Sequence, residues 1–290
     1  MKTAYRSLRA GFRLVAAAIL TLISYLLALV ARGCGIFSRR FAARGQGWAY
    51  QFWSRSLCWV FSVRVAVRGT PPTRPFFLAS NHLSYIDVLA LGTQLPCVFV
   101  AKAEIDGWPI FGAICRSVNT IFIDRKVKRK LPQILQRIDE SLAAGQGVVV
   151  FPEGTSGAGD RVMPFRSPLL EFAMNYPGGV HHAAISYRAP AGETPTHLSV
   201  CWWGDMPLGA HLREFLWLPS VAATIDFGSG GEGPKQADDR KKLTAELHAA
   251  VVAGFEPCVS EEEVERLRRL KTEDPQSLPR VLRNSPDRFS

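Results

Sequence analysis

The residues best suited to chemistry are a histidine and an aspartate five positions apart, His82 and Asp87, within the segment NHLSYID at 81–87. Apolar runs lie on both sides of it, at 76–79 and 88–91. Five residues of a helix turn through about 500°, which would leave the two side chains about 140° apart. They can meet only if His82 lies in a loop after a strand and Asp87 in the first turn of the next helix. A carboxylate placed there would hold one imidazole nitrogen and leave the other free as a base.

The same segment also fits a purely structural role. Ser84 and Asp87 have the spacing of a capping box, with Ser84 as the N-cap residue and Asp87 at the third helical position. Under this interpretation Asp87 stabilises the helix, and His82 is an ordinary loop residue. The segment alone fits structure somewhat better than chemistry, so other parts of the chain have to decide.

Length and charge limit the possible functions. The chain has 290 residues, enough for one good-sized domain with additions, and a net charge of +10. This excess predicts an anionic partner, such as nucleic acid, an anionic membrane or a phosphorylated substrate. Six scattered cysteines without a CxxC pair argue against a zinc site or a disulfide framework and favour a reducing compartment. No recognisable nucleic-acid-binding fold is present, so we expect no nucleic-acid partner.

The N-terminus favours a membrane as the anionic partner. Residues 14–31 carry no charge, and as a helix they would be about 27 Å long, near the lower limit for crossing a bilayer. A signal peptide is the main alternative, but no small-x-small cleavage site follows, so we expect a retained membrane helix. Its flanking basic residues are balanced and leave the orientation open. The aromatic-rich segment 48–61 fits an interfacial helix or, alternatively, a buried core helix.

From residue 62 onward, short apolar runs alternate with helical patterns, which is typical of an α/β domain. The strand candidates are 76–79, 98–101, 120–123, 148–151, 183–187, 198–202 and 222–227. Apolar residues at helical spacing predict a helix over 131–142, closed by Gly145, and we expect a second helix over 168–175. The glycine-rich segment 228–233 lacks the lysine of a P-loop and is interpreted as a linker.

The character of the chain changes after Pro257. Ser260 and Glu263 form a second capping-box pattern, which predicts the start of a short charged helix. Beyond Lys271 the sequence is polar and contains prolines, and we expect little order there.

Four further segments place polar residues at the ends of predicted strands or in loops. They are FIDR ending at Arg125, FPEGTS at 151–156, the isolated Lys102 after an apolar run, and MPFR at 163–166. An arginine can bind phosphate with a bidentate fork, and a glutamate, a glycine and hydroxyls offer an acceptor, close backbone approach and donors. The alternatives are a solvated helix start around Arg125 and a simple turn at FPEGTS.

In combination, NHLSYID, FIDR and FPEGT, in this order and at these separations, resemble the glycerolipid acyltransferase family, which acylates lysophosphatidic acid and related lysolipids. The resemblance covers about residues 60–230. It implies an α/β fold with a central mixed β-sheet flanked by helices, divided as 1–62 membrane-associating helices, 63–255 acyltransferase domain and 256–290 charged helix and tail. It also implies an O-acyltransferase of the cell membrane (the inner membrane of a Gram-negative cell), with the catalytic domain on the cytoplasmic side.

The resemblance also implies roles for individual residues. His82 would take the proton from the acceptor hydroxyl, and Asp87 would orient His82 and stabilise its imidazolium. The alkoxide would attack the thioester of acyl-CoA or acyl carrier protein directly, without a cofactor, a metal or an acyl-enzyme. The acceptor, such as 1-acylglycerol-3-phosphate, would be bound by Arg125, Glu153, Gly154, Thr155, Lys102, Ser84 and Asn81.

Two departures from the family pattern bear on the acceptor. The arginine that usually follows FPEGT is Ser156 here, and the fourth motif reads HHAAI at 181–185, where a proline is usual. Losing the arginine removes one expected phosphate ligand, although Arg161 or Arg166 could replace it. FPEGT without its arginine, with MPFRS at 163–167 and WWGD at 202–205, resembles the branch that acylates lyso-ornithine lipids. A phosphate-free lysolipid is therefore the alternative acceptor.

Three rival functions fit the sequence less well. A hydrolase using Ser84 or Ser156 would need a GxSxG elbow, which the sequence lacks. A metal-dependent enzyme would need more than one histidine at a credible site. A membrane or lipid-binding protein without catalytic activity is the strongest non-enzymatic alternative.

Overall fold

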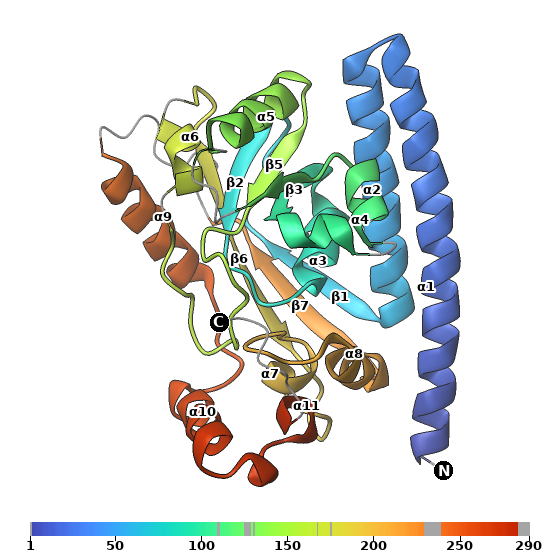
Figure 1. The fold of residues 1–290 in the computed structure, drawn as a ribbon, viewed down its shortest axis with the longest axis vertical. Coiled ribbons are helices and arrows are strands. Elements are labelled where there is room, and N and C mark those ends of the chain that lie inside the picture. The colour runs from blue at the N-terminus through green and yellow to red at the C-terminus, as the bar shows by residue number, and fades with distance from the viewer. Residues whose placement is uncertain are drawn as a thin grey trace.

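The computed structural model describes residues 2–108, 111–124, 129, 131–166, 168–174, 176–228 and 239–283. Within these ranges, seven strands form one sheet in the order β1-β7-β6-β2-β5-β3-β4 (Figure 1). The neighbours from β6 to β4 are parallel, β7 is antiparallel to β6, and β1 is parallel to β7. The predicted mixed α/β sheet is confirmed. The strands are β1 Val63–Arg68, β2 Phe76–Ser80, β3 Cys97–Lys102, β4 Ile121–Ile123, β5 Gly147–Val150, β6 Val180–Arg188 and β7 Val221–Asp226.

Helices cover both faces of this sheet, as the unbroken apolar sequence of β2 requires. On one face, Phe76 and Leu78 of β2 pack into a cluster that includes side chains of α2, α3 and α8. On the other face, Phe77 and Ala79 pack with side chains of α5 and α9. The helices are α1 Lys2–Gly33, α2 Arg39–Phe61, α3 Ile86–Gln94, α4 Phe111–Ser117, α5 Leu131–Ala143, α6 Glu171–Met174, α7 Thr196–Ser199, α8 Leu208–Trp217, α9 Arg240–Gly254, α10 Glu261–Glu273 and α11 Arg280–Arg283.

The two N-terminal helices form an antiparallel hairpin along one side of the sheet (Figure 1). In the described part of the chain, one helix, Thr3–Ile36, is long and apolar enough to cross a membrane. This helix is also docked on the protein. Near its start, the Arg13 guanidinium is buried and donates to the carbonyl oxygens of Leu216 and Leu218 at the end of α8, at 3.0 and 2.6 Å.

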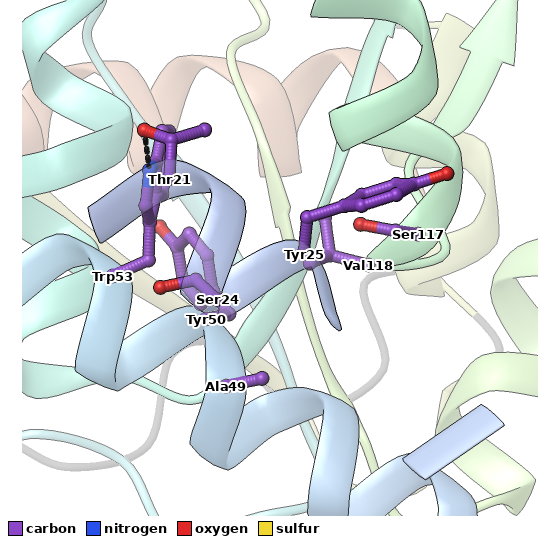
Figure 2. A pocket seen from close by; sticks show the side chains of 8 residues that line it. All are labelled: Thr21, Ser24, Tyr25, Ala49, Tyr50, Trp53, Ser117 and Val118. Atoms are coloured by element: carbon purple, nitrogen blue, oxygen red, sulfur yellow. Dashed lines mark hydrogen bonds between the residues drawn. The ribbon is translucent and has the colours of Figure 1, made fainter. Parts of the chain in front are cut away.

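A second contact fixes the middle of α1. The indole N–H of Trp53 on α2 donates to Thr21 Oγ1 at 2.9 Å (Figure 2). The two residues border a cavity of about 20 Å³, which is large enough for a single water molecule at most. The α1–α2 hairpin therefore packs tightly through its polar as well as its apolar residues.

Helix α2 combines both of the roles considered for its aromatic-rich segment. Tyr50 and Phe61 are buried in the core, whereas Trp48 and Trp59 are 73% and 78% exposed. One face of α2 therefore belongs to the globular domain, and the opposite face presents aromatic rings to the surroundings.

The strand predicted over 198–202 is wrong. The chain there forms the short helix α7 and then a loop, in which the Trp202 N–H donates to the Leu83 carbonyl oxygen at 2.8 Å. The apolar run is buried against the loop that follows β2, which explains its composition without a place in the sheet. Conversely, β1 was not predicted, although its valines alternate with polar and small residues as in an edge strand.

The prediction for the C-terminus is half right. Ser260 accepts a hydrogen bond from the Glu263 N–H at 3.2 Å and starts α10, as the capping box predicted. The expected lack of order after Lys271 is wrong as far as residue 283, because α11 follows and Leu278, Val281 and Leu282 are buried in the core. Isolated apolar residues in a polar sequence gave no periodic signal for this packing.

Two helix predictions and one linker prediction have mixed outcomes. Helix α5 ends before Gly145, whose φ of +82° suits glycine. The helix expected over 168–175 is a 3₁₀ turn, Pro168–Leu170, followed by α6, and position 175 lies outside the described residues. Of the expected linker 228–233, only Gly228 is described.

Candidate active site

Parallel pairing of β2 with β5 brings two of the predicted motifs together. In the register of this pair, Ala79 lies opposite Val150. The residues three positions further on, His82 and Glu153, therefore leave the same carboxyl edge of the sheet side by side. The His82 backbone N–H donates to Glu153 Oε1 at 3.0 Å, and the Gly157 N–H donates to the His82 carbonyl oxygen at 2.8 Å.

His82 and Asp87 meet as their spacing predicted. His82 lies in the loop after β2, Asp87 lies in the first turn of α3, and His82 Nδ1 is 2.7 Å from Asp87 Oδ2. A carboxylate at this position favours the tautomer with the proton on Nδ1, which leaves the lone pair of Nε2 free to accept a proton. The His82 side chain is 25% exposed and the Asp87 side chain is fully buried. The base is thus accessible, whereas the group that orients it is not.

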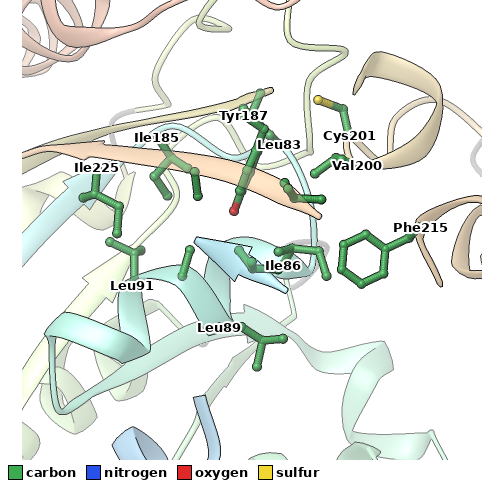
Figure 3. Packing of buried hydrophobic residues seen from close by; sticks show 14 of the residues in the cluster. Leu83, Ile86, Leu89, Leu91, Ile185, Tyr187, Val200, Cys201, Phe215 and Ile225 are labelled. Carbon is green, nitrogen blue, oxygen red and sulfur yellow. The ribbon is translucent and has the colours of Figure 1, made fainter. Parts of the chain in front are cut away.

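Asp87 is held by four hydrogen bonds, counting the one from His82. Its Oδ2 accepts the backbone N–H groups of Leu83 and Ser84 at 2.7 and 3.0 Å, and its Oδ1 accepts the Tyr187 hydroxyl at 2.8 Å. A buried carboxylate is tolerated when it is hydrogen-bonded in this way. Burial, with the nearby Asp87 charge, raises the pKa of Tyr187 well above its usual value, so the hydroxyl stays a donor. Tyr187 itself lies within the apolar core (Figure 3).

Only one of the two side-chain hydrogen bonds of the predicted capping box at Ser84 forms. Asp87 accepts the Ser84 N–H, but the N-cap position is Tyr85, and the buried Ser84 Oγ has no hydrogen-bond partner among the described residues. The prediction that Ser84 caps α3 with its side chain is therefore wrong. Asp87 stabilises the helix start while it holds His82, so its two roles are compatible.

Aromatic rings form one wall beside the base. The Phe151 ring stacks on the His82 imidazole with centroids 4.2 Å apart and an angle of 14° between the planes. Phe99 stacks on Phe151 in turn, at 5.8 Å. This wall restricts rotation of the imidazole and presents apolar surface next to it.

Glu153 supports the loop that carries His82, because it accepts the hydrogen bond from the His82 backbone N–H. The side chain is 2% exposed, and burial raises the pKa of its carboxyl to about 9. A carboxyl group with this pKa is protonated at neutral pH, so the His82 backbone N–H donates to a neutral carboxyl group. In this arrangement Glu153 positions the loop that carries His82.

The other predicted site residues lie in different parts of the structure, from the buried core to an exposed turn. Asn81 is fully buried and bonds the backbone of Ile185 in β6 through both ends of its amide, at 2.9 and 2.7 Å. Gly154 occupies a turn with φ of +77°, a conformation that favours glycine, and Thr155 next to it is exposed. Lys102 ends β3 at the same edge of the sheet. Arg125 lies outside the described residues.

Ser156, which stands where the family pattern has an arginine, and the two nearby arginines form contacts within the protein. Ser156 donates its hydroxyl to the Trp202 carbonyl oxygen. Arg161, a possible substitute, forms an ion pair with Glu261 of α10 at 2.6 Å. Arg166 is exposed, and its backbone N–H donates to the Pro152 carbonyl oxygen at 2.8 Å.

Sequence reasoning missed two contributors to this site. Tyr187 ended a predicted strand, but nothing in its spacing connects it with Asp87, which is 100 residues away. Phe151 was part of a recognised motif, yet its contact with His82 depends on the β2–β5 register. Among the described residues, no group of three or more His, Cys, Asp or Glu side chains could hold a metal ion.

Comparisons with known proteins agree with this geometry. The Acyltransferase family model matches residues 63–188. The lyso-ornithine lipid O-acyltransferase of Rhizobium meliloti (strain 1021) is 34% identical over 209 residues, which cover 68% of this chain and 71% of that protein. The 1-acyl-sn-glycerol-3-phosphate acyltransferase of Neisseria gonorrhoeae is 27% identical over 176 residues, covering 61% of this chain and 68% of that protein.

A solved structure shows the same fold. The crystal structure of the 1-acyl-sn-glycerophosphate (LPA) acyltransferase from Thermotoga maritima is similar with a TM-score of 0.52 and 21% sequence identity, covering 83% of this chain and 96% of that one. The chain therefore belongs to the acyltransferase family. It is an O-acyltransferase with relatives named for lysolipid acceptors, as the three motifs predicted.

Proposed function

We propose that the protein transfers a fatty acyl group from a thioester to the hydroxyl of a lysolipid, with His82 as the general base. The observation that carries this proposal is the 2.7 Å contact between His82 and the buried Asp87. It leaves Nε2 as the proton acceptor on an accessible ring.

In this mechanism, Nε2 removes the proton from the acceptor hydroxyl as its oxygen attacks the thioester carbonyl carbon. Asp87 stabilises the imidazolium that forms. When the tetrahedral intermediate collapses, the carbon–sulfur bond breaks and the thiolate takes the proton from His82. The ester is formed, the free thiol leaves, and the enzyme returns to its initial state without a covalent intermediate. Acyl-CoA and acyl carrier protein both supply such a thioester.

A lyso-ornithine lipid is the acceptor that the chain supports best, with 1-acylglycerol-3-phosphate as the alternative. The Rhizobium meliloti relative is named for the former and the Neisseria gonorrhoeae relative for the latter. At the position where the family pattern has an arginine, this chain has Ser156, and its hydroxyl is bonded to the Trp202 carbonyl oxygen. A phosphate monoester would find one cation fewer there, whereas an ornithine headgroup has no phosphate to bind.

The test is a comparison of acceptors with the purified protein. Lyso-ornithine lipid and lysophosphatidic acid are each offered with a labelled acyl thioester, and the product is quantified. His82→Ala should lower the rate by about 10³-fold, because general base catalysis contributes about 10²–10⁴-fold. His248→Ala, which changes a histidine on α9, serves as the matched control and should keep its activity. A folded His82→Ala variant with full activity would overturn the mechanism.

We further propose that the hairpin binds the membrane in the plane of its surface. Arg13 and Trp53 tie one side of α1 to the protein, so a perpendicular span would draw the domain into the bilayer. Its other side presents a stripe of exposed apolar side chains that continues on α2 with Phe41, Trp48 and Trp59. On α1 this stripe consists of Tyr5, Leu8, Phe12, Val15, Ile19, Leu22, Leu26 and Val30. The catalytic domain would lie on the cytoplasmic side, where thioester donors are available.

Flotation with anionic lipid vesicles tests this arrangement. Replacing Trp48 and Trp59 by serine removes two interfacial anchors and should reduce the bound fraction several-fold. Extraction of the wild-type protein by high pH would agree with surface binding. Resistance to extraction, together with unchanged binding of the double variant, would indicate a spanning helix instead.

A further inference from the structure

A cavity of about 300 Å³ lies between the FPEGTS loop and the C-terminal helices, and the proposed mechanism does not use it. One wall is the loop 155–158, and the opposite wall is formed by α10 with the segment that leads into α11. Its volume is at the lower end of the range for ligand pockets, about 300–1,000 Å³. It therefore suits a small polar group rather than a whole lipid.

The lining residues divide by chemistry and by burial. Leu267, Leu278 and Trp203 are buried and form the apolar part of the lining. Arg268 and Lys271 contribute two cationic side chains that are 44% and 45% exposed. The floor of the cavity is thus apolar, and its open side is charged.

A carboxylate lies among these cations. Asp205 lines the same cavity, is 15% exposed and forms an ion pair with Lys271. Thr155 and Ser156 complete the polar lining with their hydroxyl groups. The cavity therefore offers both signs of charge within one small volume.

The two walls are fastened to each other and to the catalytic loop. Arg161 and Glu261 link the segment after FPEGTS to the first turn of α10 at 2.6 Å. Gly157, in the loop wall, donates its N–H to the His82 carbonyl oxygen at 2.8 Å. A ligand in the cavity is therefore in contact with the backbone segment that holds the catalytic base.

We propose that this cavity binds the headgroup of the lysolipid acceptor and selects a headgroup that carries both a carboxylate and an ammonium group. The inference rests on the proposed function and extends it to the choice of acceptor. Arg268 and Lys271 receive the carboxylate, and Asp205 receives the ammonium group. The headgroup replaces the Asp205–Lys271 ion pair with two ion pairs of its own, and the Lys271 side chain, which is 45% exposed, has room to move away from Asp205.

Asp205 makes the cavity discriminate between acceptors. A phosphate monoester could use the two cations, but it would bring two negative charges next to the Asp205 carboxylate. Like charges within one small cavity oppose binding. A site that repels one headgroup and attracts another discriminates between them through both interactions. The same carboxylate is an attractive partner for the terminal ammonium group of ornithine.

The experiment compares kcat/KM for three acceptors with the full-length protein. They are lyso-ornithine lipid, the analogue with norvaline in place of ornithine, which keeps the carboxylate and lacks the terminal ammonium group, and lysophosphatidic acid. The wild-type protein should prefer ornithine to norvaline about tenfold, and Asp205→Asn should abolish this preference. Arg268→Gln and Lys271→Gln should each lower kcat/KM for both amino-acid acceptors by about fivefold to tenfold. Arg269→Gln, on the same helix but outside the cavity, is the charge-matched control and should change nothing.

The outcomes separate this inference from the proposed function. If the wild-type protein acylates the acceptors, His82→Ala does not, and the three cavity variants keep the wild-type preferences, the headgroup binds elsewhere and the inference is overturned. If Arg269→Gln has the same effect as Lys271→Gln, the cavity has no specific role and the inference is also overturned. If the wild-type protein acylates no lysolipid at all, the proposed function itself fails.

Discussion

The surroundings of Asp87 and Asp205 differ in almost every respect. Asp87 is fully buried, and both of its oxygens accept hydrogen bonds from the backbone, His82 and Tyr187. Asp205 lies at the open side of a cavity and pairs with a flexible lysine on a helix close to the C-terminus. The first environment allows one geometry only, whereas the second can exchange its partners. The reaction type thus depends on the rigid region, and the choice of acceptor on the adaptable one.

The contrast also predicts how much a substitution costs in each region. A single change in a closed hydrogen-bond network leaves a buried group without a partner, which is costly. At the Asp205–Lys271 pair the lysine side chain is 45% exposed, so water reaches the pair and a change there should cost less. Substitutions in the two regions should therefore differ in size as well as in kind.

The largest effect is expected for Asp87→Asn. The amide cannot stabilise the imidazolium, and its N–H₂ group faces donors instead of accepting from them, so kcat should fall by about 10³-fold or more. Tyr187→Phe removes only one of the four hydrogen bonds and should cost about tenfold or less. Steady-state kinetics on folded, purified variants would measure both. Equal losses for the two variants would contradict the view that the charge of Asp87 matters most.

Glu153 gives an intermediate test with a pH dependence. Glu153→Ala removes the acceptor of the His82 N–H and should lower kcat by about tenfold to a hundredfold, whereas Glu153→Gln keeps a neutral acceptor and should stay close to wild type. Because burial raises the pKa of Glu153 to about 9, its contribution to stability is complete below pH 4.5 and is lost as the pH rises to about 9.

Thermal unfolding between pH 5 and pH 9 would detect this loss. The wild-type protein should be destabilised relative to Glu153→Gln as the pH increases, because the glutamine does not titrate. A Gln variant as inactive as the Ala variant would show that Glu153 acts through its charge.

The smallest effect is expected for Ser156→Arg, which restores the arginine of the family pattern. The added cation at the polar lining should raise kcat/KM for lysophosphatidic acid a few-fold and lower it slightly for lyso-ornithine lipid. Ser156→Gln controls for the loss of the hydroxyl bond to Trp202 and should not favour the phosphate. If the ratio of the kcat/KM values for the two acceptors is the same in the Arg variant and the wild-type protein, position 156 does not contribute to the choice of headgroup.

The sequence predicted those parts of the site that depend on local spacing. His82 and Asp87 are five residues apart, and a strand, a loop and a helix start are enough to bring them together. Contacts that depend on register across the sheet were not predictable. Examples are the hydrogen bond from the His82 N–H to Glu153 and the one from the Tyr187 hydroxyl to Asp87. The run at 198–202 misled because burial against a loop needs the same apolar residues as a strand.

The cavity was beyond sequence reasoning for a related reason. Lys271 is 66 residues from Asp205, and it lies where the predicted charged helix was expected to give way to a segment with little order. Val264 and Leu267 of that helix, together with Leu278 and Leu282 beyond it, are buried in the core and fix the helix against the domain. The C-terminal part of the chain therefore contributes both cations of the proposed headgroup site.

In the proposed surface arrangement, the Arg13 guanidinium sets the height of His82 above the lipid. Because it fastens α1 to the end of α8, the membrane-binding hairpin and the sheet edge form one rigid unit. A spanning helix tilts or stretches to match the thickness of its bilayer. A helix that lies along the surface has no such length to match. Turnover of this enzyme should therefore be the same in thin and thick membranes of equal surface charge.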